Sequence, residues 1–326
     1  MDAPPLRYLS SADLELCLPS VAERVELASR ALVALANDGA EMPSKIGVHP
    51  RPGALLHAMP AWLRDGDLVG LKWIAAFPGN RSRDLPAING LVVLNDAETG
   101  LPTWIMDAAR ITAVRTAAVS GVAIRLLTPA VVERVAILGS GIQARSHMDV
   151  VRSLLPDATL VLYDRHRERA ESLADEVRGG GGTAEAVDDA RSATDSAQVV
   201  VTVATIGAAS QVMAPDWVAP GTLVVAVDFA TYVSAELARG AGTFLVDDLT
   251  QFLAYRDAGY FDGYPEPSGT MGEALERPRL DPEAADAGTS GVDVVSHLGV
   301  GLADVVLADA IAQKASASGL GVELVR

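Results

Sequence analysis

One short stretch has the residue types and spacing of a phosphate-binding turn. The segment 132–138 is apolar and rich in β-branched residues, and it is followed at once by Gly139-Ser140-Gly141-Ile142-Gln143-Ala144. A glycine at 139 permits a sharp turn off a strand, and a glycine at 141 lets the backbone approach a pyrophosphate at the amino end of the next helix. Ala144 keeps that helix close to the strand. The pattern predicts a nicotinamide or flavin dinucleotide.

An acidic residue completes this predicted nucleotide site. Asp164 directly follows the apolar run 159–163 and lies 23 residues after Gly141. This is close to the offset, about 20 residues, of the acid that binds the adenosine ribose in such folds. A carboxylate at that place repels a 2′-phosphate and therefore favours NAD. Arg165 follows it, and a guanidinium there could hold a 2′-phosphate, so NADP stays open.

A lysine in an apolar segment is the second unusual feature. The chain has 26 Lys and Arg residues, of which only those at 45, 72 and 314 are lysines. Lys72 lies inside the apolar run 68–77. An ammonium group in an apolar strand must point to water, to an anion or to a ligand. Both an edge-strand lysine facing solvent and a ligand-binding lysine fit this pattern.

The elements that must position these residues form two groups along the chain. Apolar residues recur at helical spacing over 11–37, and short β-like segments follow at 45–49, 54–59, 68–77, 89–95 and 101–106. A helical pattern over 107–127 leads into the glycine turn. This predicts an α+β domain placed before a dinucleotide-binding fold.

The second group alternates strands and helices. Strands are expected at 132–138, 159–163, 198–203, 222–227 and near 243–246, with helices over 166–178 and near 186–194. This alternation predicts an α/β fold, a Rossmann-type doubly wound parallel sheet. The Gly-, Pro- and acid-rich stretch 262–291 is predicted to be a surface loop or lid, and a last helix near 299–318 is expected to fold back on the first domain.

Composition narrows the functional class. A chain of 326 residues predicts two domains, and the formal charge of −16 argues against a nucleic-acid partner. Apolar runs stay well short of about 18 residues and no secretory leader is visible, so we expect a soluble, cytoplasmic protein with no membrane partner. The single Cys17 excludes an intrachain disulfide. The five histidines lack metal-ligand spacing, so no metal is predicted.

Several motifs together resemble one known family. In chain order they are Met59-Pro60, Gly70-Leu71-Lys72, the stretch 94–100, Met106-Asp107, the block 111–118 (ITAVRTAA), the glycine turn 139–144 and the stretch 296–304 (SHLGVGLAD). This order resembles the ornithine cyclodeaminase/mu-crystallin family over nearly the whole chain. The resemblance implies a substrate-binding and dimerisation domain over 1–117 with 299–326, and a dinucleotide-binding Rossmann domain over 118–298. It also implies a homodimer.

The resemblance assigns roles to individual residues. Lys45, Lys72 and Arg115 would gather around the carboxylate of a small amino acid or imine. The residue types agree, since the guanidinium of Arg115 is a planar fork for a carboxylate and Lys72 can supply a charge or a proton. Thr116 would contact the cofactor phosphate. Thr202 and Ala204 would line its sugar.

The chain departs from the family pattern in two places. The family usually has arginine where this chain has Lys45, and a single ammonium lacks the bidentate grip. In the cyclodeaminases an aspartate that serves the distal amine of the substrate aligns with Ala230, whereas the carboxylate here is Asp228. Two residues along a strand keep the same face but move a group by about 6.5 Å.

Three functions follow as hypotheses. The first is a cyclodeaminase acting on an ornithine- or lysine-like amino acid, with Asp228 accepting protons from the distal amine. The second is an amino-acid dehydrogenase or ketimine reductase, for which a carboxylate clamp and Lys72 as proton donor suffice. The third is a small-ligand-binding protein without catalysis. His147 is interpreted as a packing or capping residue, and Asp304 either faces the site or is a solvated or capping acid.

Overall fold

The chain divides into two compact units. The computed structural model describes residues 5–205, 210–277 and 291–325. Unit 1 comprises Met1–Arg115 and Gly299–Arg326, and unit 2 comprises Thr116–Leu298. The long helix α3 (Ala108–Leu127) contains the first border between them. Unit 2 is therefore inserted into the sequence of unit 1.

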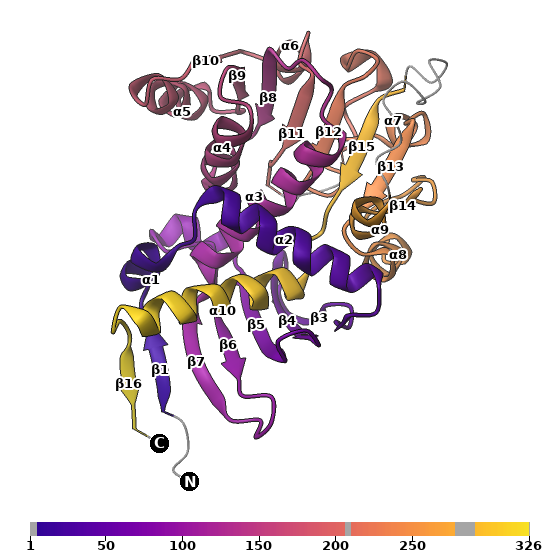
Figure 1. The fold of residues 1–326 in the computed structure, drawn as a ribbon. Coiled ribbons are helices and arrows are strands. Elements are labelled where there is room, and N and C mark those ends of the chain that lie inside the picture. Colours follow the sequence, from indigo (N-terminus) through magenta and orange to yellow (C-terminus); the bar gives the residue numbers. More distant parts are fainter. Residues whose placement is uncertain (1–4, 206–209, 278–290, 326) are drawn as a thin grey trace. The chain divides into compact units, whose positions relative to one another are not determined.

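Unit 1 is built on one mostly antiparallel sheet (Figure 1). Its order is β16-β1-β7-β6-β5-β4-β2, with β3 also paired to β4, and only β1 and β7 are parallel. The strands are β1 (Leu6–Leu9), β2 (Ala40–Glu41), β3 (Ile46–Arg51), β4 (Ala54–Leu63), β5 (Leu68–Ala76), β6 (Ile88–Asn95), β7 (Pro102–Asp107) and β16 (Val322–Leu324). The helices outside α3 are α1 (Ser11–Cys17), α2 (Val21–Ala36), the 3-10 helix η1 (Pro78–Arg83) and α10 (Gly301–Ala317).

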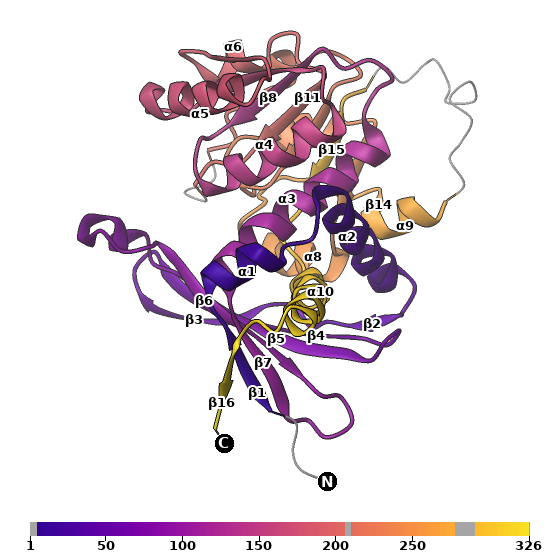
Figure 2. The ribbon, with the colours of Figure 1, turned by 60° about the vertical axis from the view of Figure 1, so that its left-hand side comes forward.

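One face of this sheet is covered by α10, and α2 packs on α10 (Figure 2). Close approach depends on small residues. A Cβ at Gly70 would lie 3.2 Å from Cγ2 of Val305, and a Cβ at Gly301 would lie 3.0 Å from the carbonyl oxygen of Met59. The first turn of α10 therefore rests almost directly on β4 and β5.

The other face of the sheet is apolar and partly exposed. Trp73 and Leu91 lie across from each other on β5 and β6 and are 39% and 41% exposed. The cross-strand pair Leu71 and Val93 lies beside them on the same face. Side chains of neighbouring strands thus form a continuous apolar row.

The predicted helix over 11–37 is wrong as a single element. The chain breaks at Leu18-Pro19-Ser20 into α1 and α2. Proline cannot continue the hydrogen-bonding of a helix interior. Ser20 then caps α2, and Glu23 completes a capping box with it. The strands β1 and β16, which pair with each other, were not predicted.

Unit 2 is a doubly wound parallel sheet, as predicted. Its order is β10-β9-β8-β11-β12-β15-β13-β14, and neighbouring strands in this order are parallel. The strands are β8 (Arg134–Leu138), β9 (Thr159–Tyr163), β10 (Ala184–Ala186), β11 (Val199–Thr202), β12 (Leu223–Ala226), β13 (Thr243–Val246), β14 (Gly269–Thr270) and β15 (Asp293–Ser296). The order reverses between β8 and β11, which makes their carboxyl ends a topological switch point.

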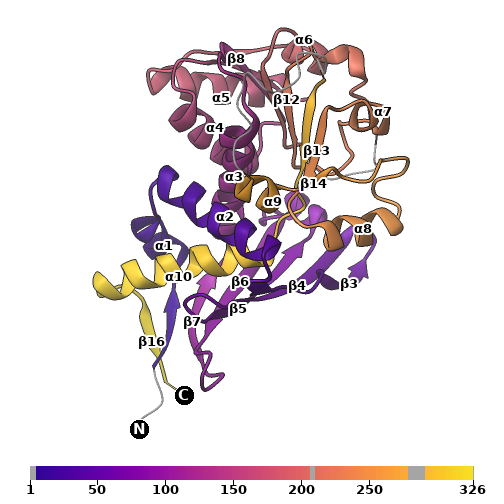
Figure 3. The same ribbon diagram turned by 45° about the vertical axis from the view of Figure 1, so that its right-hand side comes forward.

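Helices line both faces of this sheet (Figure 3). They are α4 (Ile142–Leu154), α5 (Arg167–Gly179), α6 (Ala190–Thr194), the 3-10 helix η2 (Pro215–Trp217), α7 (Ala235–Arg239), α8 (Leu249–Asp257) and α9 (Met271–Glu276). One core packs α6, α7 and α8 against every second strand residue, such as Leu138, Val200 and Val224. The intervening residues, such as Ile137 and Val201, are equally buried. Burial on both faces explains the unbroken apolar strands.

Two local predictions in unit 2 need correction. Where a helix was expected from 186, the short strand β10 comes first and α6 begins only at Ala190. The predicted loop or lid 262–291 contains β14, which pairs with β13, and the capped helix α9. Residues 278–290 of that stretch lie outside the described residues.

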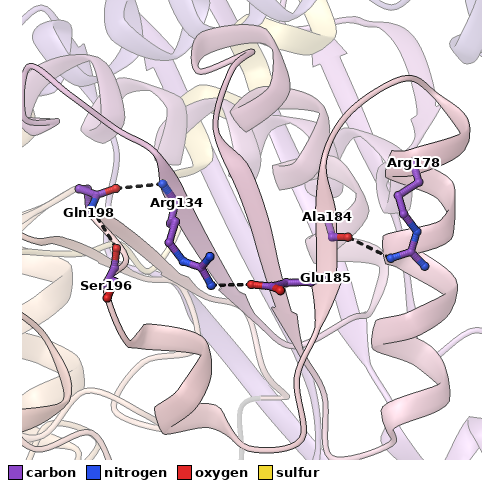
Figure 4. A network of polar contacts seen from close by, with 6 residues as sticks. All are labelled: Arg134, Arg178, Ala184, Glu185, Ser196 and Gln198. Carbon is purple, nitrogen blue, oxygen red and sulfur yellow. Dashed lines mark hydrogen bonds and ion pairs between the residues drawn. The ribbon is translucent and has the colours of Figure 1, made fainter.

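A polar network fastens the amino ends of the central strands (Figure 4). The side-chain oxygen of Gln198 accepts 2.9 Å hydrogen bonds from the N–H groups of Glu133 and Arg134, and its amide donates to the carbonyl of Ser196. Arg134 in turn pairs with Glu185 of β10. These residues therefore stabilise the amino-terminal end of the sheet. The glycine turn lies at the opposite end, after the carboxyl end of β8.

No described helix is long and apolar enough to cross a membrane. No group of three or more His, Cys, Asp and Glu side chains in the described part of the chain could hold a metal ion.

A glycine substitution tests the sheet of unit 1. A Cβ at Gly90 would lie 2.2 Å from the carbonyl oxygen of Trp73, so we expect Gly90→Ala to lower the free energy of unfolding by about 1–3 kcal/mol. Gly79→Ala is the control, because a Cβ there meets nothing within 4 Å. Denaturant unfolding measures both. Equal stability of the two variants would contradict the packing described for β5 and β6.

Candidate functional site

The predicted nucleotide-binding residues gather at the carboxyl ends of the central parallel strands. This end of the sheet is called the nucleotide edge below. Leu138 at the end of β8 lies across from Tyr163 of β9 and Thr202 of β11, and Thr202 lies across from Ala226 of β12. The carboxyl ends of four adjacent strands therefore meet. The glycine turn, Asp164, Ala204 and Asp228 all follow directly from these ends.

The glycine turn has the geometry that its sequence predicts. Gly139 adopts a φ of 113°, and a Cβ there would lie 2.9 Å from the carbonyl oxygen of Val203. Only glycine fits both requirements. Gly141 is the N-cap of α4, and nothing lies within 4 Å of the place that a Cβ would take, so the space above it is open. Ile142 is largely exposed, whereas Ala144 is buried against the sheet.

Asp164 is fixed to this turn. One carboxylate oxygen accepts a 2.9 Å hydrogen bond from the N–H of Ser140, and the other accepts one of 2.9 Å from the N–H of His166. The carboxylate is half-buried at the end of β9, and Arg165 beside it is exposed. Backbone donors thus set the position of the acid relative to the glycines.

Asp228 is used inside the same edge. Its side chain is buried, with an exposed fraction of 1%. One carboxylate oxygen accepts a 2.7 Å hydrogen bond from the hydroxyl of Thr202, and the other accepts a 3.2 Å hydrogen bond from the N–H of Ala204. Burial raises the pKa of Asp228 to about 7, against these bonds. The carboxylate therefore holds the backbone that leaves β11.

Several buried polar atoms at this edge remain for a ligand. The hydroxyl oxygens of Ser140 and Ser296 and the side-chain oxygen of Gln143 are buried and have no hydrogen-bond partner among the described residues. Such atoms normally find a partner in the protein, in water or in a ligand. Together with the open space above Gly141, they fit a bound dinucleotide. Thr116 is buried at the start of unit 2.

A buried serine links two histidines nearby in unit 2. The hydroxyl of Ser120 lies 2.8 Å from Nε2 of His147 and 2.8 Å from Nε2 of His297. Nδ1 of His147 lies 2.7 Å from the carbonyl oxygen of Gln143, and burial lowers the pKa of His147 to about 4. Neutral His147 thus joins α3, the start of α4 and the end of β15, which agrees with its interpretation as a packing residue.

Unit 1 holds two buried cations on one carboxylate. Nζ of Lys72 lies 2.7 Å from Oδ2 of Asp304, and Nε of Arg115 lies 2.9 Å from Oδ1. The exposed fractions are 1% for Lys72, 6% for Arg115 and 0% for Asp304. Asp304 follows Gly301 by three residues, so it lies on the face of α10 that touches the sheet. Lys72 therefore points inward to an anion, and its alternative position at a solvent-facing edge is wrong.

Arg115 keeps an unused donor. Its Nη1 is buried and has no hydrogen-bond partner among the described residues. Gly299 makes room for this guanidinium, since a Cβ there would lie 2.3 Å from Nη1 of Arg115. A buried guanidinium with a free edge is suited to a carboxylate ligand.

Lys72 is tuned toward neutral pH. The pKa of Lys72 is lowered to about 7, mainly by burial and in part by the charges of Arg115 and Lys45, while Asp304 opposes the shift. At this pKa the side chain can both donate and accept a proton near neutrality. Lys45 is half-buried and acts electrostatically on Lys72, so the lysines predicted together lie near each other.

Sequence reasoning missed the centre of this cluster. Asp304 had two open interpretations, and neither made it the partner of Lys72 and Arg115. The signal was present, because a lysine in an apolar strand and an aspartate in an apolar helix both need a partner of opposite charge. Ser296 was also missed as a polar group at the nucleotide edge.

Known proteins with similar sequences were compared with this chain. The model of the ornithine cyclodeaminase/mu-crystallin family matches residues 10–243. This chain belongs to that family. The family was already indicated by the motifs around Lys72, Arg115 and the glycine turn.

Three similar proteins illustrate the range of the family. The chain is 37% identical to the nodulation efficiency protein NfeD of Rhizobium meliloti over 317 residues, which cover 97% of this chain and 98% of that one. It is 33% identical to the ketimine reductase mu-crystallin of Mus musculus over 172 residues, 53% of each chain. The fold is similar to that of an archaeal alanine dehydrogenase dimer with bound NAD, with a TM-score of 0.85, 25% identity and coverage of 98% and 99%.

Removal of the shared carboxylate should destabilise unit 1. Asp304→Ala leaves Lys72 and Arg115 buried without their counterion, which we expect to cost about 3–5 kcal/mol of unfolding free energy. The control is Asp65→Ala, which breaks an exposed pair with Arg30 and should cost at most about 1 kcal/mol. Denaturant unfolding compares the two. If Asp304→Ala lowers the unfolding free energy as little as the control does, the stabilising role of the ion pairs of Asp304 with Lys72 and Arg115 is contradicted.

Proposed function

We propose that this chain is an NAD(P)-dependent oxidoreductase that acts at the α-carbon of a small amino acid or imino acid. The observation that carries the proposal is the buried cluster of Lys72, Arg115 and Asp304, which combines an unused guanidinium donor with a lysine of neutral pKa. The glycine turn and Asp164 of unit 2 would hold the cofactor. The similarity to a ketimine reductase and to an NAD-bound alanine dehydrogenase supports the same reaction class.

The residues of unit 1 divide the work on the substrate. Nη1 of Arg115 donates to the α-carboxylate, and Asp304 fixes the guanidinium from the other side. Lys72 gives its proton to the imine nitrogen in the reductive direction and takes one from the amine in the oxidative direction. Lys45 adds positive charge beside Lys72 and favours binding of the anion.

The nucleotide edge is assigned to the cofactor. Gly139, Gly141, Ile142, Gln143, Ala144 and Thr116 would hold the pyrophosphate, Asp164 the adenosine ribose, and Thr202 and Ala204 the other sugar. When bound, the nicotinamide supplies or accepts the hydride. Asp164 favours NAD, and the exposed Arg165 leaves NADP open.

Cyclodeamination is the second candidate and has less support. It needs a group that accepts protons from the distal amine, and Asp228 is the predicted one. Both oxygens of Asp228 already accept hydrogen bonds from Thr202 and Ala204, and the side chain is buried.

The pairing of two copies stays a prediction, with the apolar face around Trp73 and Leu91 as the available surface.

A substrate screen tests the proposal. The purified protein is given NADH or NADPH with cyclic ketimines, or with 2-oxo acids and ammonia, and the absorbance of the reduced nicotinamide is followed. We expect stoichiometric consumption of the reduced cofactor. Formation of proline from ornithine with catalytic NAD would favour the cyclodeaminase instead, and binding without turnover would favour the ligand-binding protein.

The pH profile tests Lys72. Its ammonium form must donate in reduction, so we expect kcat/KM for reduction to fall as the pH rises through about 7 and kcat/KM for oxidation to rise over the same range. Lys72→Met should remove turnover while NADH affinity is kept. Lys314→Met, which changes an exposed lysine of α10, is the control. Full activity of Lys72→Met would refute this role.

The nucleotide preference tests Asp164. Asp164→Ser removes the carboxylate that would accept hydrogen bonds from the ribose hydroxyls, so we expect NADH to bind about tenfold more weakly. NADPH should lose less, because its phosphate no longer faces the carboxylate. Asp157→Ser, at an exposed carboxylate, is the control. Calorimetric titration of both cofactors decides, and equal losses for NADH and NADPH would count against Asp164 as the ribose ligand.

A further inference from the structure

His57 lies beside the lysine cluster on the same face of the sheet. On β4, Met59 is across from Lys72, and His57 is two residues earlier on the same face, across from Ile74. On its other side His57 is across from Gly47 of β3. A Cβ at Gly47 would lie 2.3 Å from Cδ2 of His57, so the imidazole occupies the space over this glycine.

The register brings a second lysine to this place. Ile46 of β3 is across from Ala58, so the same register continued by one residue places Lys45 across from Met59. Lys45, Met59 and Lys72 thus share one cross-strand row, and His57 is in the next row. Two residues along a strand span about 6.6 Å, a length that a five-carbon amino acid can bridge.

The groups that act on His57 are all basic. The pKa of His57 is lowered to about 4, mainly by burial and in part by the charges of Lys45, His49 and Lys72. His57 is therefore neutral at pH 7 and offers one N–H donor. The carboxylate of Asp304 is already shared by Lys72 and Arg115.

We infer that His57 selects substrates by the group at the end of the substrate's side chain. A terminal carboxylate is admitted, and a terminal ammonium is disfavoured. This inference rests on the proposed function, in which Arg115 holds the α-carboxylate. A second carboxylate in the row of His57 receives its N–H and lies close to the lysine charges. An ammonium in that row meets like charges, which costs binding free energy.

Three acids of equal length test the selection. L-glutamate, L-norvaline and L-ornithine differ only in the end of a five-carbon chain, and each is oxidised with NAD⁺ or NADP⁺ by the wild type. We expect kcat/KM to fall in the order glutamate, norvaline, ornithine, with glutamate about tenfold or more above ornithine. His57→Glu should reverse the order of glutamate and ornithine and leave norvaline nearly unchanged. His57→Gln, which keeps a neutral donor, should keep the wild-type order.

The outcomes separate this inference from the proposed function. If norvaline is oxidised but the wild type treats glutamate and ornithine alike, or His57→Glu changes neither, the selection by His57 is wrong and the oxidoreductase stands. If no acid is oxidised, the proposed reaction fails. Calorimetric titration of the three acids into protein loaded with NAD⁺ then still reports the preference, and equal affinities would overturn it. Thermal unfolding of each variant confirms that it folds.

Discussion

The ion pairs between Asp304, Lys72 and Arg115 are the interaction on which unit 1 depends. A buried ammonium or guanidinium without a counterion costs several kcal/mol, and here both cations are almost fully enclosed. Both cations pair with the carboxylate of Asp304, which lies on the face of α10 that packs on the sheet. The small residues Gly70 and Gly301 follow from the same need, because any larger side chain would lift the helix off the strands.

One carboxylate for two cations also leaves the cluster incomplete. Asp304 can neutralise only one charge, and the free edge of Arg115 has no partner among the described residues. An anionic ligand would balance the charge and complete the hydrogen bonding in one step. Burial is the main cause that lowers the pKa of Lys72, and the unbalanced charge of Arg115 contributes to the same shift.

Local sequence signals predicted unit 2 better than unit 1. The glycine turn, the acid after β9 and the buried apolar strands are each encoded within a few residues, and they sufficed for the Rossmann-type sheet and for the place of Asp164. The pairing of Arg115 with Asp304 joins residues 189 positions apart, and no local pattern records such a partner. Strands β1 and β16 are four and three residues long and lack a clear alternation, so only their pairing defines them. The break before α2 was visible in Pro19, but helical periodicity on both sides outweighed it.

The interrupted order of unit 1 has a consequence for synthesis on the ribosome. Lys72 and Arg115 are made before unit 2, and Asp304 emerges only after unit 2 is complete. Until then the sheet face that α10 covers is open, with an apolar surface and two cations that await their counterion. Since domains generally fold as units in the order of synthesis, unit 2 can mature first while unit 1 remains an aggregation-prone intermediate. Helix α10 is therefore made after unit 2, although it closes the core of the segment that is made before unit 2.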